Sequence, residues 1–350
     1  MPIKIVEFDA LTAAEETWDI YFRHIDGILR ETSPEDPLLS WEKRKPMIIS
    51  DTYNPFFYTH RFLIFPEESC REAAGHSAIC LETPQSPSYQ ANKHIGTVKL
   101  TVSKDHRRKG LGSELLKHVI SAAKIKEPSL AELVIPVMLE SGRYFLDRLG
   151  GTVSIETAEN RLYLKDVDWP MVTSWAEEGA RKNPGTVIKT VPAIPEEDLQ
   201  DYSGAYTETF NQAPSGDLAF ENIYTPEKIR FSEQKNAAQG VVQTTMYSKE
   251  CDGKISGLTE IYYLKELGHK VAQNLTGVRQ AYKGRGLGKM LKAEMLLYIR
   301  REYPDVKYIS TGNADSNAPM LSINQRLGFK KHRPIKVYKL KLSHIVPPRV

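Results

Sequence analysis

The sequence predicts an α/β protein made of two similar domains, each a mixed, mostly antiparallel sheet flanked by helices. Three observations predict this class. Segments with the two-residue period of strands alternate with segments of helical period. A glycine-rich turn between a strand and a helix occurs twice. The chain has 350 residues and 41% hydrophobic content, which is enough for two separate cores.

The clearer glycine-rich turn follows an apolar segment that ends at Val278. Its sequence is Lys283-Gly284-Arg285-Gly286-Leu287-Gly288-Lys289, and apolar residues at helical spacing then run to about Glu302. The first turn of a helix has unpaired backbone N–H groups and the positive end of the helix dipole, and glycines let an anion approach them. We therefore expect the turn to bind a phosphate, with positive charge added by Lys283, Arg285 and Lys289.

The same pattern occurs earlier in the chain. After Val102 the sequence reads Arg107-Arg108-Lys109-Gly110-Leu111-Gly112-Ser113. The two turns are 176 residues apart (110 to 286), and a second matching pair, Arg148-Leu149-Gly150 and Arg326-Leu327-Gly328, is 178 residues apart (150 to 328). Because the spacing is nearly constant over this length, we infer the duplication of a whole domain.

The expected elements of the first half follow the same periodicities. Residues 95–102 alternate apolar and polar side chains, and Trp18, Tyr21, Phe22 and Ile25 lie at helical spacing. Strands are expected at 3–8, 56–65, 75–81, 95–102, 133–137 and 161–165, and helices at 13–30, 41–49, after the glycine turn and at 141–149. A helix at 169–182, ended by Asn183-Pro184-Gly185, is expected to connect the halves.

The second half repeats this order. Strands are expected at 186–191, 241–247, 255–264, 271–278, 307–311 and 337–342, and helices at 196–211, 226–234, after the glycine turn and at 318–327. The expected domains are therefore 1–166 and 186–345, joined by a connecting helix within 167–185.

Both turns end a strand and fit the pattern [Gln/Arg]-x-x-Gly-x-[Gly/Ala], with Lys283 in the first position of the second copy. The Rossmann pattern needs glycine where Lys289 stands, and the Walker pattern needs glycine where Lys283 stands. The pattern resembles the pyrophosphate-binding motif of the GNAT superfamily of N-acetyltransferases. The segment from Asn317 to Phe329 also resembles the helix of that family which begins at an asparagine and ends in Gly-Phe.

The resemblance implies two tandem GNAT-like domains, acetyl-CoA as co-substrate and no metal. Its cofactor-binding residues would be Val278, Lys283, Gly284, Arg285, Gly286, Leu287, Gly288, Lys289, Asn313 and Asn317, and in the first half Val102, Arg107, Arg108, Lys109, Gly110, Leu111, Gly112 and Ser113. Asn317 also fits an ordinary helix N-cap, so both interpretations stay open for it.

The resemblance also identifies candidate catalytic residues. Many GNAT members carry a tyrosine that protonates the departing thiolate, and here that position is Asn324 in the second half and Leu146 in the first. Water, Tyr282 or Tyr338 are the alternatives for this role. Glu260 is the candidate base for the incoming amine, although a solvated strand carboxylate is the structural alternative. Asp315 and Glu221 are weaker candidates.

Comparison of the halves predicts which one is catalytic. If Gly75 matches Gly257, Ala78 stands in the place of Glu260, and Leu139 stands in the place of Asn317. We therefore expect a degenerate N-terminal domain and a catalytic C-terminal domain that acetylates a primary amine of a small molecule. A non-catalytic acyl-CoA binding or sensing protein is the competing hypothesis.

Composition limits the partners. The 47 basic and 44 acidic residues leave a net charge of only +3, and no aromatic residues interleave with the basic run at 106–109, so a nucleic-acid partner is not expected. Neither a signal peptide nor a membrane span is recognisable, and three cysteines (Cys70, Cys80 and Cys251) without a Cys-x-x-Cys pair indicate ordinary thiols. A cytoplasmic monomer or homodimer is expected.

Overall fold

The computed structural model describes residues 3–66 and 71–345. The chain forms two compact units. Unit 1 holds residues 1–154, 217–220 and 336–350, and unit 2 holds residues 155–216 and 221–335. Cys80 and Cys251 are free thiols, and Cys70 lies outside the described residues.

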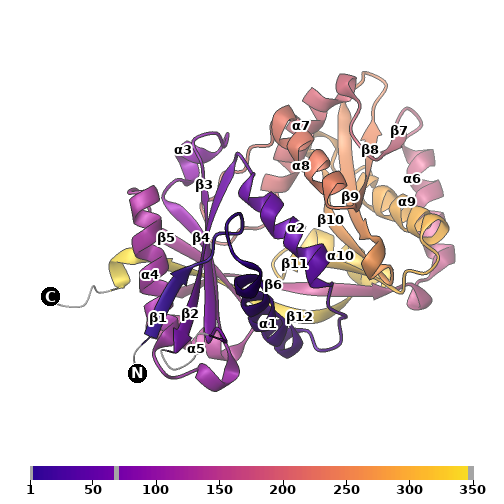
Figure 1. The fold of residues 1–350 in the computed structure, drawn as a ribbon. Coiled ribbons are helices and arrows are strands. Elements are labelled where there is room, and N and C mark those ends of the chain that lie inside the picture. The colour runs from indigo at the N-terminus through magenta and orange to yellow at the C-terminus, as the bar shows by residue number, and fades with distance from the viewer. Residues whose placement is uncertain (1–2, 67–70, 346–350) are drawn as a thin grey trace. The chain divides into compact units, whose positions relative to one another are not determined.

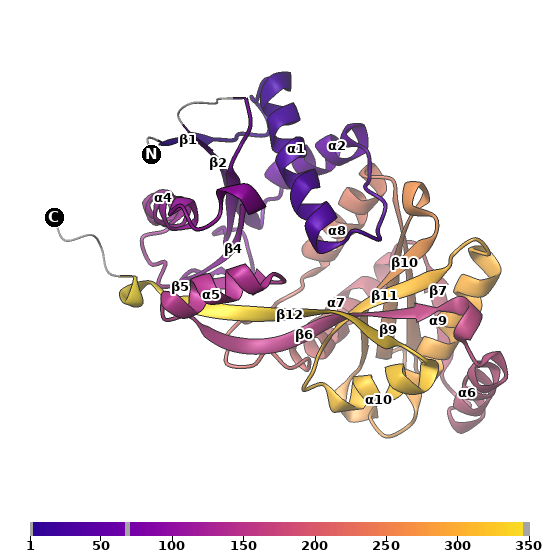
Figure 2. The ribbon, with the colours of Figure 1, turned by 90° about the horizontal axis from the view of Figure 1, so that it is seen from below.

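Unit 1 is a mixed, mostly antiparallel sheet with helices on both faces (Figures 1 and 2). In sheet order its strands are β1 (Ile3–Glu7), β2 (Phe57–Pro66), β3 (Gly75–Glu82), β4 (Ile95–Val102), β5 (Glu132–Val137) and the end of β12 (Lys330–Lys341). Its helices are α1 (Glu15–Thr32), α2 (Trp41–Thr52), α3 (Tyr89–Asn92), α4 (Leu111–Lys126) and α5 (Glu140–Arg148). Among the described strand pairs of unit 1, only β4 and β5 run parallel.

The alternation along β2 explains the two hydrophobic layers of unit 1. Phe62 and Ile64 join the core that contains the buried face of α4, whereas Leu63 and Phe65 join the core that contains Trp18 of α1. Because successive strand side chains point to opposite faces, one strand supplies both layers. The sheet is therefore covered by α4 on one face and by α1 on the other (Figure 2).

Unit 2 repeats this architecture. In sheet order its strands are β6 (Thr152–Tyr163), β11 (Tyr308–Ala314), β10 (Lys270–Val278), β9 (Ile255–Leu264), β8 (Val241–Lys249) and β7 (Val187–Val191). Its helices are α6 (Trp169–Lys182), α7 (Glu196–Asn211), α8 (Pro226–Ala238), α9 (Leu287–Glu302) and α10 (Ala318–Leu327). Met246 packs with the α6 and α9 layer and Tyr247 with the α7 and α8 layer, so the period of two again separates the cores.

The duplication is visible in matched strand pairs. Gly75 pairs with Val102 in unit 1, and Gly257 pairs with Val278 in unit 2. A Cβ at either glycine would approach a backbone oxygen of the next strand, at 2.7 Å in unit 1 and 3.0 Å in unit 2. The expected match of Gly75 with Gly257 therefore agrees with the pairing.

The sheet of each unit contains one strand from the other half of the chain. Residues 336–341 of β12, at the C-terminal end, pair antiparallel with β5 in unit 1, and residues 157–163 of β6, from the N-terminal half, pair antiparallel with β11 in unit 2. The compact units thus differ from the expected domains 1–166 and 186–345. The expected connecting helix is α6, which packs in the core of unit 2 through Val172 and Trp175.

The two exchanged strands are also longer than expected. β6 begins at Thr152 and β12 at Lys330, whereas the sequence pattern indicated only 161–165 and 337–342. Within the described parts of the chain, no helix has both the length and the hydrophobicity needed to cross a membrane.

Candidate active site in unit 2

Strands β10 and β11 separate where a β-bulge interrupts β10. They pair in parallel over residues 270–272 and 308–310, and the register of β10 against β9 then shifts between Gln273 and Thr276. A bulge bends its strand and leaves residues outside the ladder, here Asn274 and Leu275. Beyond it, both strands line one cleft.

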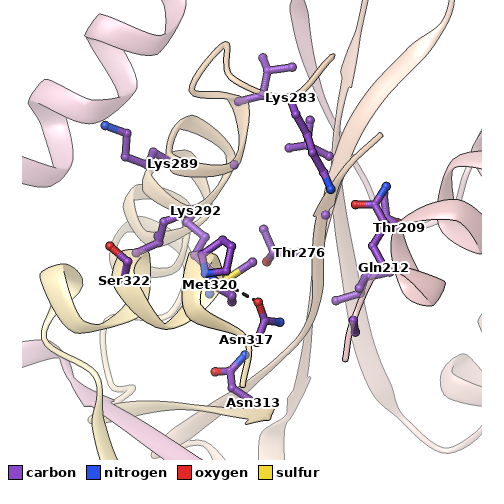
Figure 3. A pocket seen from close by; sticks show the side chains of 18 of the residues that line it. Thr209, Gln212, Thr276, Lys283, Lys289, Lys292, Asn313, Asn317, Met320 and Ser322 are labelled. Atoms are coloured by element: carbon purple, nitrogen blue, oxygen red, sulfur yellow. Dashed lines mark hydrogen bonds between the residues drawn. The ribbon is translucent and has the colours of Figure 1, made fainter. Parts of the chain in front are cut away.

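The cleft has a volume of about 730 Å³ and lies entirely within unit 2. Figure 3 shows side chains that face it from β10, α7, α9, α10 and the end of β11. The lining includes Thr209, Gln212, Asn274, Thr276, Val278, Lys283, Gly284, Gly286, Leu287, Gly288, Lys289, Lys292, Asn313, Asn317, Met320 and Arg326. Its size suits an elongated small ligand.

The glycine turn forms one end of this cleft, at a strand-to-helix junction. Gly284 and Gly286 have φ values of 83° and 81°, in the left-handed region that favours glycine, and Gly286 is the N-cap of α9. Met290 donates its amide to the Gly286 carbonyl at 3.1 Å, as the first i to i−4 hydrogen bond of α9. The amides that precede Met290 in the first turn therefore have no i−4 acceptor within the helix. Gly284 is exposed. The junction therefore presents backbone donors to the cleft, as the sequence predicts.

The cations at this end differ in what they can reach. Lys283 and Lys289 line the cleft. Arg285 does not: its guanidinium donates to Asn183 and Thr186 at 2.9 Å each and to Glu250 at 3.0 Å. The expectation that the Arg285 side chain binds the phosphate is therefore corrected, because the side chain holds the turn against the segment after α6.

Trp175 of α6 organises two further cations of the cleft. Its ring lies 5.3 Å from the Lys289 Nζ and 4.5 Å from the Arg326 guanidinium carbon. Cation–π contacts of this length hold the side chains in place. Trp175 matches no motif, so this arrangement is not predicted from the sequence.

Helix α7 forms one side of the cleft and crosses β10 at Gly277. A Cβ on Gly277 would lie 2.4 Å from the Thr209 Cβ, so only glycine permits this approach. Thr209 also lines the cleft (Figure 3).

Glu260 lies behind the cleft wall and does not line it. The side chain is 2% exposed on β9, and its carboxylate accepts hydrogen bonds from Tyr202 at 2.7 Å and Tyr206 at 3.2 Å. Burial raises the pKa of Glu260, and the bonds from tyrosine and amide donors oppose that rise. The solvated-carboxylate alternative is therefore wrong, and direct contact of Glu260 with a ligand in the cleft is not supported.

Asn274, one of the bulge residues, connects Glu260 to the cleft. Its Nδ2 donates to Glu260 at 3.1 Å, to the Tyr206 hydroxyl at 3.2 Å and to the Tyr262 hydroxyl at 3.3 Å. Because the carboxylate fixes which end of the amide faces it, the Asn274 Oδ1 is directed away from Glu260. The sequence pattern missed Asn274, which lies within the bulge and matches no motif.

Three candidate asparagines lie on β11 and α10, and two of them, Asn313 and Asn317, line the cleft. Asn317 is the N-cap of α10 and accepts from the Met320 amide at 3.4 Å, and it also lines the cleft (Figure 3). Asn324 is 2% exposed and donates to the Asn313 Oδ1 at 2.7 Å. Among the described residues its own Oδ1 has no hydrogen-bond partner. A neutral amide is thus buried where a proton donor was considered.

Of the other candidate acids and bases, Tyr282 lines the cleft, whereas Tyr338 and Asp315 do not. Tyr338 belongs to unit 1, where its ring is 3% exposed in the core and its hydroxyl donates to Asp147 at 3.0 Å. The expectation that Tyr338 serves the site in unit 2 is corrected, because β12 carries it into the other unit. Tyr282 lines the cleft beside the glycine turn. Asp315 pairs with Lys331 at 2.7 Å and does not line the cleft.

Lys292 is a second residue of this site that the sequence analysis missed. It is 2% exposed on α9, lines the cleft, and donates from Nζ to the Gln273 Oε1 at 2.8 Å. Burial lowers the pKa of Lys292 to about 7. Figure 3 shows the side chain pointing from α9 into the interior of the cleft.

The glycine turn of unit 1 has a backbone shape similar to that of unit 2. The side chain of Arg107, at the first position of its motif, is however already paired. Arg108 has φ 64° where unit 2 has Gly284, and Gly110 has φ 81° as the N-cap of α4. Arg107 donates to the Val102 carbonyl at 3.0 Å and to Glu31 at 2.7 Å, and the Glu31 ion pair is bidentate. Arg108, Lys109 and Gly110 are exposed, whereas Leu111 is buried in the core.

The architecture and the glycine junctions can now be compared with known proteins. The model of the acetyltransferase (GNAT) family matches residues 27–134, which lie in unit 1. A solved structure of a tandem GNAT protein from the clavulanic acid biosynthesis pathway is similar with a TM-score of 0.73 at 18% identity, over 99% of this chain and 100% of that chain. The chain has the tandem GNAT fold.

Two further solved structures share the GNAT fold at low identity. A GCN5-related N-acetyltransferase from Sphaerobacter thermophilus has a TM-score of 0.64 at 16% identity, over 97% of this chain and 96% of that chain. A GCN5-related glucosamine N-acetyltransferase region of a fungal multi-domain β-N-acetylglucosaminidase has a TM-score of 0.65 at 12% identity, over 97% of this chain and 38% of that chain. No curated protein matches the chain.

No metal site accompanies this GNAT fold in the described residues. Within residues 3–66 and 71–345, no group of three or more histidine, cysteine, aspartate or glutamate side chains is arranged to hold a metal ion.

Proposed function

We propose that unit 2 binds acetyl-CoA along its cleft and transfers the acetyl group to a primary amine of a small molecule. The observation that carries this proposal is the continuous cleft from the amides of the glycine junction to the bulge of β10. The diphosphate would lie against the amides of residues 284–289, between Lys283 and Lys289. The acyl-pantetheine arm would pass Val278 and Thr276 toward Asn274.

The reaction is a direct displacement. The amine nitrogen bonds to the carbonyl carbon, the carbon–sulfur bond breaks, and the sulfur leaves with the electron pair. The ammonium loses one proton to solvent in the cleft before attack, and the nitrogen loses a second proton to solvent as the amide forms. The Asn274 Oδ1 accepts a hydrogen bond from the amine, and Glu260 acts as a positioning residue that holds the Asn274 amide. In this proposal Asn324 and Asn317 support the wall along the arm.

Unit 1 is proposed not to bind acetyl-CoA. Arg107 is already paired with Glu31, and Leu116 and Ala78 stand where unit 2 has Lys292 and Glu260. Since the family model matches unit 1, this part of the proposal needs a matched pair of variants.

Equivalent positions of the two turns provide that pair. Gly284→Asp adds a carboxylate at the proposed diphosphate site, in a left-handed backbone conformation that strains any side chain but that Arg108 adopts at the equivalent position of unit 1. We expect it to weaken acetyl-CoA at least about tenfold in calorimetric titration, a change of about 1.4 kcal/mol. Arg108→Asp should leave the affinity unchanged. Loss of binding in Arg108→Asp alone would assign the site to unit 1.

Turnover distinguishes an enzyme from a sensor. Release of the CoA thiol should be measured with a panel of primary amines, and the acetylated amine identified by mass spectrometry. Turnover with at least one amine, lost in Gly284→Asp, supports the transferase. Tight acetyl-CoA binding with no turnover across the panel would favour the non-catalytic acyl-CoA binding protein instead.

A further inference from the structure

Lys292 is a buried cation without a counter-charge. Among the described residues no carboxylate forms an ion pair with it, and its Nζ donates to the neutral side chain of Gln273. A buried, unpaired ammonium destabilises a fold, so its presence in a core position needs another explanation.

The other half of the chain shows what the core itself requires at this position. The matching residue, 176 positions earlier, is Leu116 on α4, which is 2% exposed within the core of unit 1. The same fold therefore accommodates leucine here. Lysine is a departure specific to the unit that contains the cleft.

The contacts of Lys292 place it beside the bulge. Gln273, which accepts from Lys292, is the last residue of β10 before the register shift. The Gln273 Nε2 donates to Thr259 at 3.3 Å, and the Thr259 and Thr276 hydroxyls are 2.7 Å apart. This chain of hydrogen bonds fixes Gln273 and hence the Nζ, which retains further N–H donors.

The surroundings of Nζ contain cations and neutral groups. Lys283, Lys289 and Arg326 are the other charged side chains of the cleft lining, and the Phe329 ring centroid lies 5.2 Å from Nζ. Glu294, two residues further along α9, lines a separate hollow with Thr244 and Arg301. Nothing in this set neutralises the ammonium, which agrees with burial as the sole cause of its lowered pKa.

We propose that Lys292 is the proton donor to the sulfur that leaves the thioester, a role that rests on the proposed function of unit 2. As the carbon–sulfur bond breaks, the sulfur takes the bonding pair and then a proton from Nζ. Lys292 becomes a neutral amine and regains a proton from solvent, which has received the proton lost by the attacking ammonium. The tyrosine of the GNAT resemblance is replaced here by Asn324, which has no acidic proton to give.

The acidity of Lys292 suits this role. Its pKa of about 7 leaves a large protonated fraction near neutral pH. A thiol such as that of cysteine has a pKa of about 8.5, so proton transfer from the ammonium to the thiolate is downhill.

An acceptor-independent experiment tests the proposal. The thiol of bound CoA is titrated by the ultraviolet absorbance of its thiolate, in the native protein and in Lys292→Leu, and desulfo-CoA binding is measured alongside. In the native protein the ammonium should lower the pKa of the bound thiol by about 1 unit, which keeps it above the pKa of Lys292, and Lys292→Leu should abolish this shift. Desulfo-CoA should bind both proteins equally.

Lys289→Leu is the matched control. It removes another cation of the cleft, near the glycine junction, so it should weaken CoA without changing the pKa of the bound thiol. With an acceptor amine in hand, Lys292→Leu should lower kcat by about 10²-fold with little change in KM for acetyl-CoA. It should also remove the decline of kcat above about pH 7 that deprotonation of Lys292 causes.

The outcomes separate the two proposals. An identical thiol pKa in the native protein and Lys292→Leu, with CoA bound to both, would overturn the role of Lys292 alone. Failure of both CoA and desulfo-CoA to bind the native protein would overturn the proposed function and this inference together.

Discussion

Single residues decide what each unit can do with one shared backbone. Unit 2 places Gly284, Lys292 and Glu260 where unit 1 places Arg108, Leu116 and Ala78. The substitutions change charge and side-chain volume around the cleft while the strand-to-helix junction keeps the same φ at its N-cap, 81° in both units. The proposed division of function between the units therefore rests on side chains, and predictions about chemistry belong at this scale.

The first prediction concerns stability and pH at Lys292. The pKa of this lysine is about 7 in the folded protein and about 10.4 in an unfolded chain. Between these values the unfolded state binds more protons, so the free energy of unfolding should rise with pH, by up to about 1.4 kcal/mol per unit. Below about pH 7 the lysine is protonated in both the folded and the unfolded state. The full free-energy cost of burying the ammonium therefore remains there.

Lys292→Leu removes that cost. We expect its melting temperature to exceed that of the native protein at neutral pH and the gain to shrink as the pH approaches 10.4. Differential scanning calorimetry of both proteins over this range is the measurement. A variant less stable than the native protein at pH 7, or a gain independent of pH, would show that the ammonium is not buried uncompensated.

A second prediction concerns Glu260 as a positioning residue. Glu260→Gln replaces an acceptor of several hydrogen bonds by a group that also donates, so the Asn274 amide loses its fixed orientation. Steady-state kinetics should show a kcat/KM for the amine that falls at least about tenfold, because orientation contributes strongly to such steps. Acetyl-CoA affinity should not change. Tyr202→Phe, which removes one donor on the far side of the carboxylate, should have the smaller effect.

At the scale of elements, the sequence predicts helices better than strands. The bounds of α6, α7 and α10 agree with the expected ranges, because local signals mark them. Asp168 caps α6 through the Met171 amide at 3.0 Å, and Gly328 ends α10 with φ 99°. β6 and β12 were recognised only at their ends. Their remaining residues are largely charged or polar, so the period of two is weak there.

The site shows the same limit. The glycine junctions were predicted because the chemistry of anion binding needs a local sequence pattern. Lys292 and Asn274 were missed because their significance depends on what lies across from them: Gln273 for the lysine, and Glu260 for the asparagine. The one local signal for Lys292 is its alignment with Leu116.

The crossing of α7 over β10 gives an element-scale prediction. Gly277→Ala places a methyl group 2.4 Å from the Thr209 Cβ, so α7 must shift where Thr209 lines the cleft. We expect a loss of about 1–3 kcal/mol in the free energy of unfolding, measured by urea denaturation. Gly312→Ala is the control on the neighbouring strand, where the new Cβ would have no neighbour within 4 Å, and it should be nearly neutral.

For the whole molecule, the exchange of strands makes each unit depend on both halves of the chain. The last strand of unit 1 comes from β12, which contributes Leu340, fully buried, and Tyr338, 3% exposed, to the core. Burial of such side chains contributes about 1.5–3 kcal/mol each. The sequence-based boundary at residue 166 would therefore remove a core strand.

A fragment of residues 1–166 tests this dependence. We expect it to aggregate or to melt without a cooperative transition. The same fragment with residues 330–345 appended through a flexible linker should recover a cooperative transition in circular dichroism. Cooperative folding of the shorter fragment would show that β12 is dispensable for unit 1.

The central claim is that the glycine junction of unit 2 holds the diphosphate of acetyl-CoA on its backbone amides. Amide hydrogen exchange, followed by mass spectrometry with and without acetyl-CoA, measures those amides directly. The account predicts slower exchange in peptides that cover residues 283–291 and no change in those that cover 107–115. Protection at 107–115 alone, or at neither junction, would contradict it.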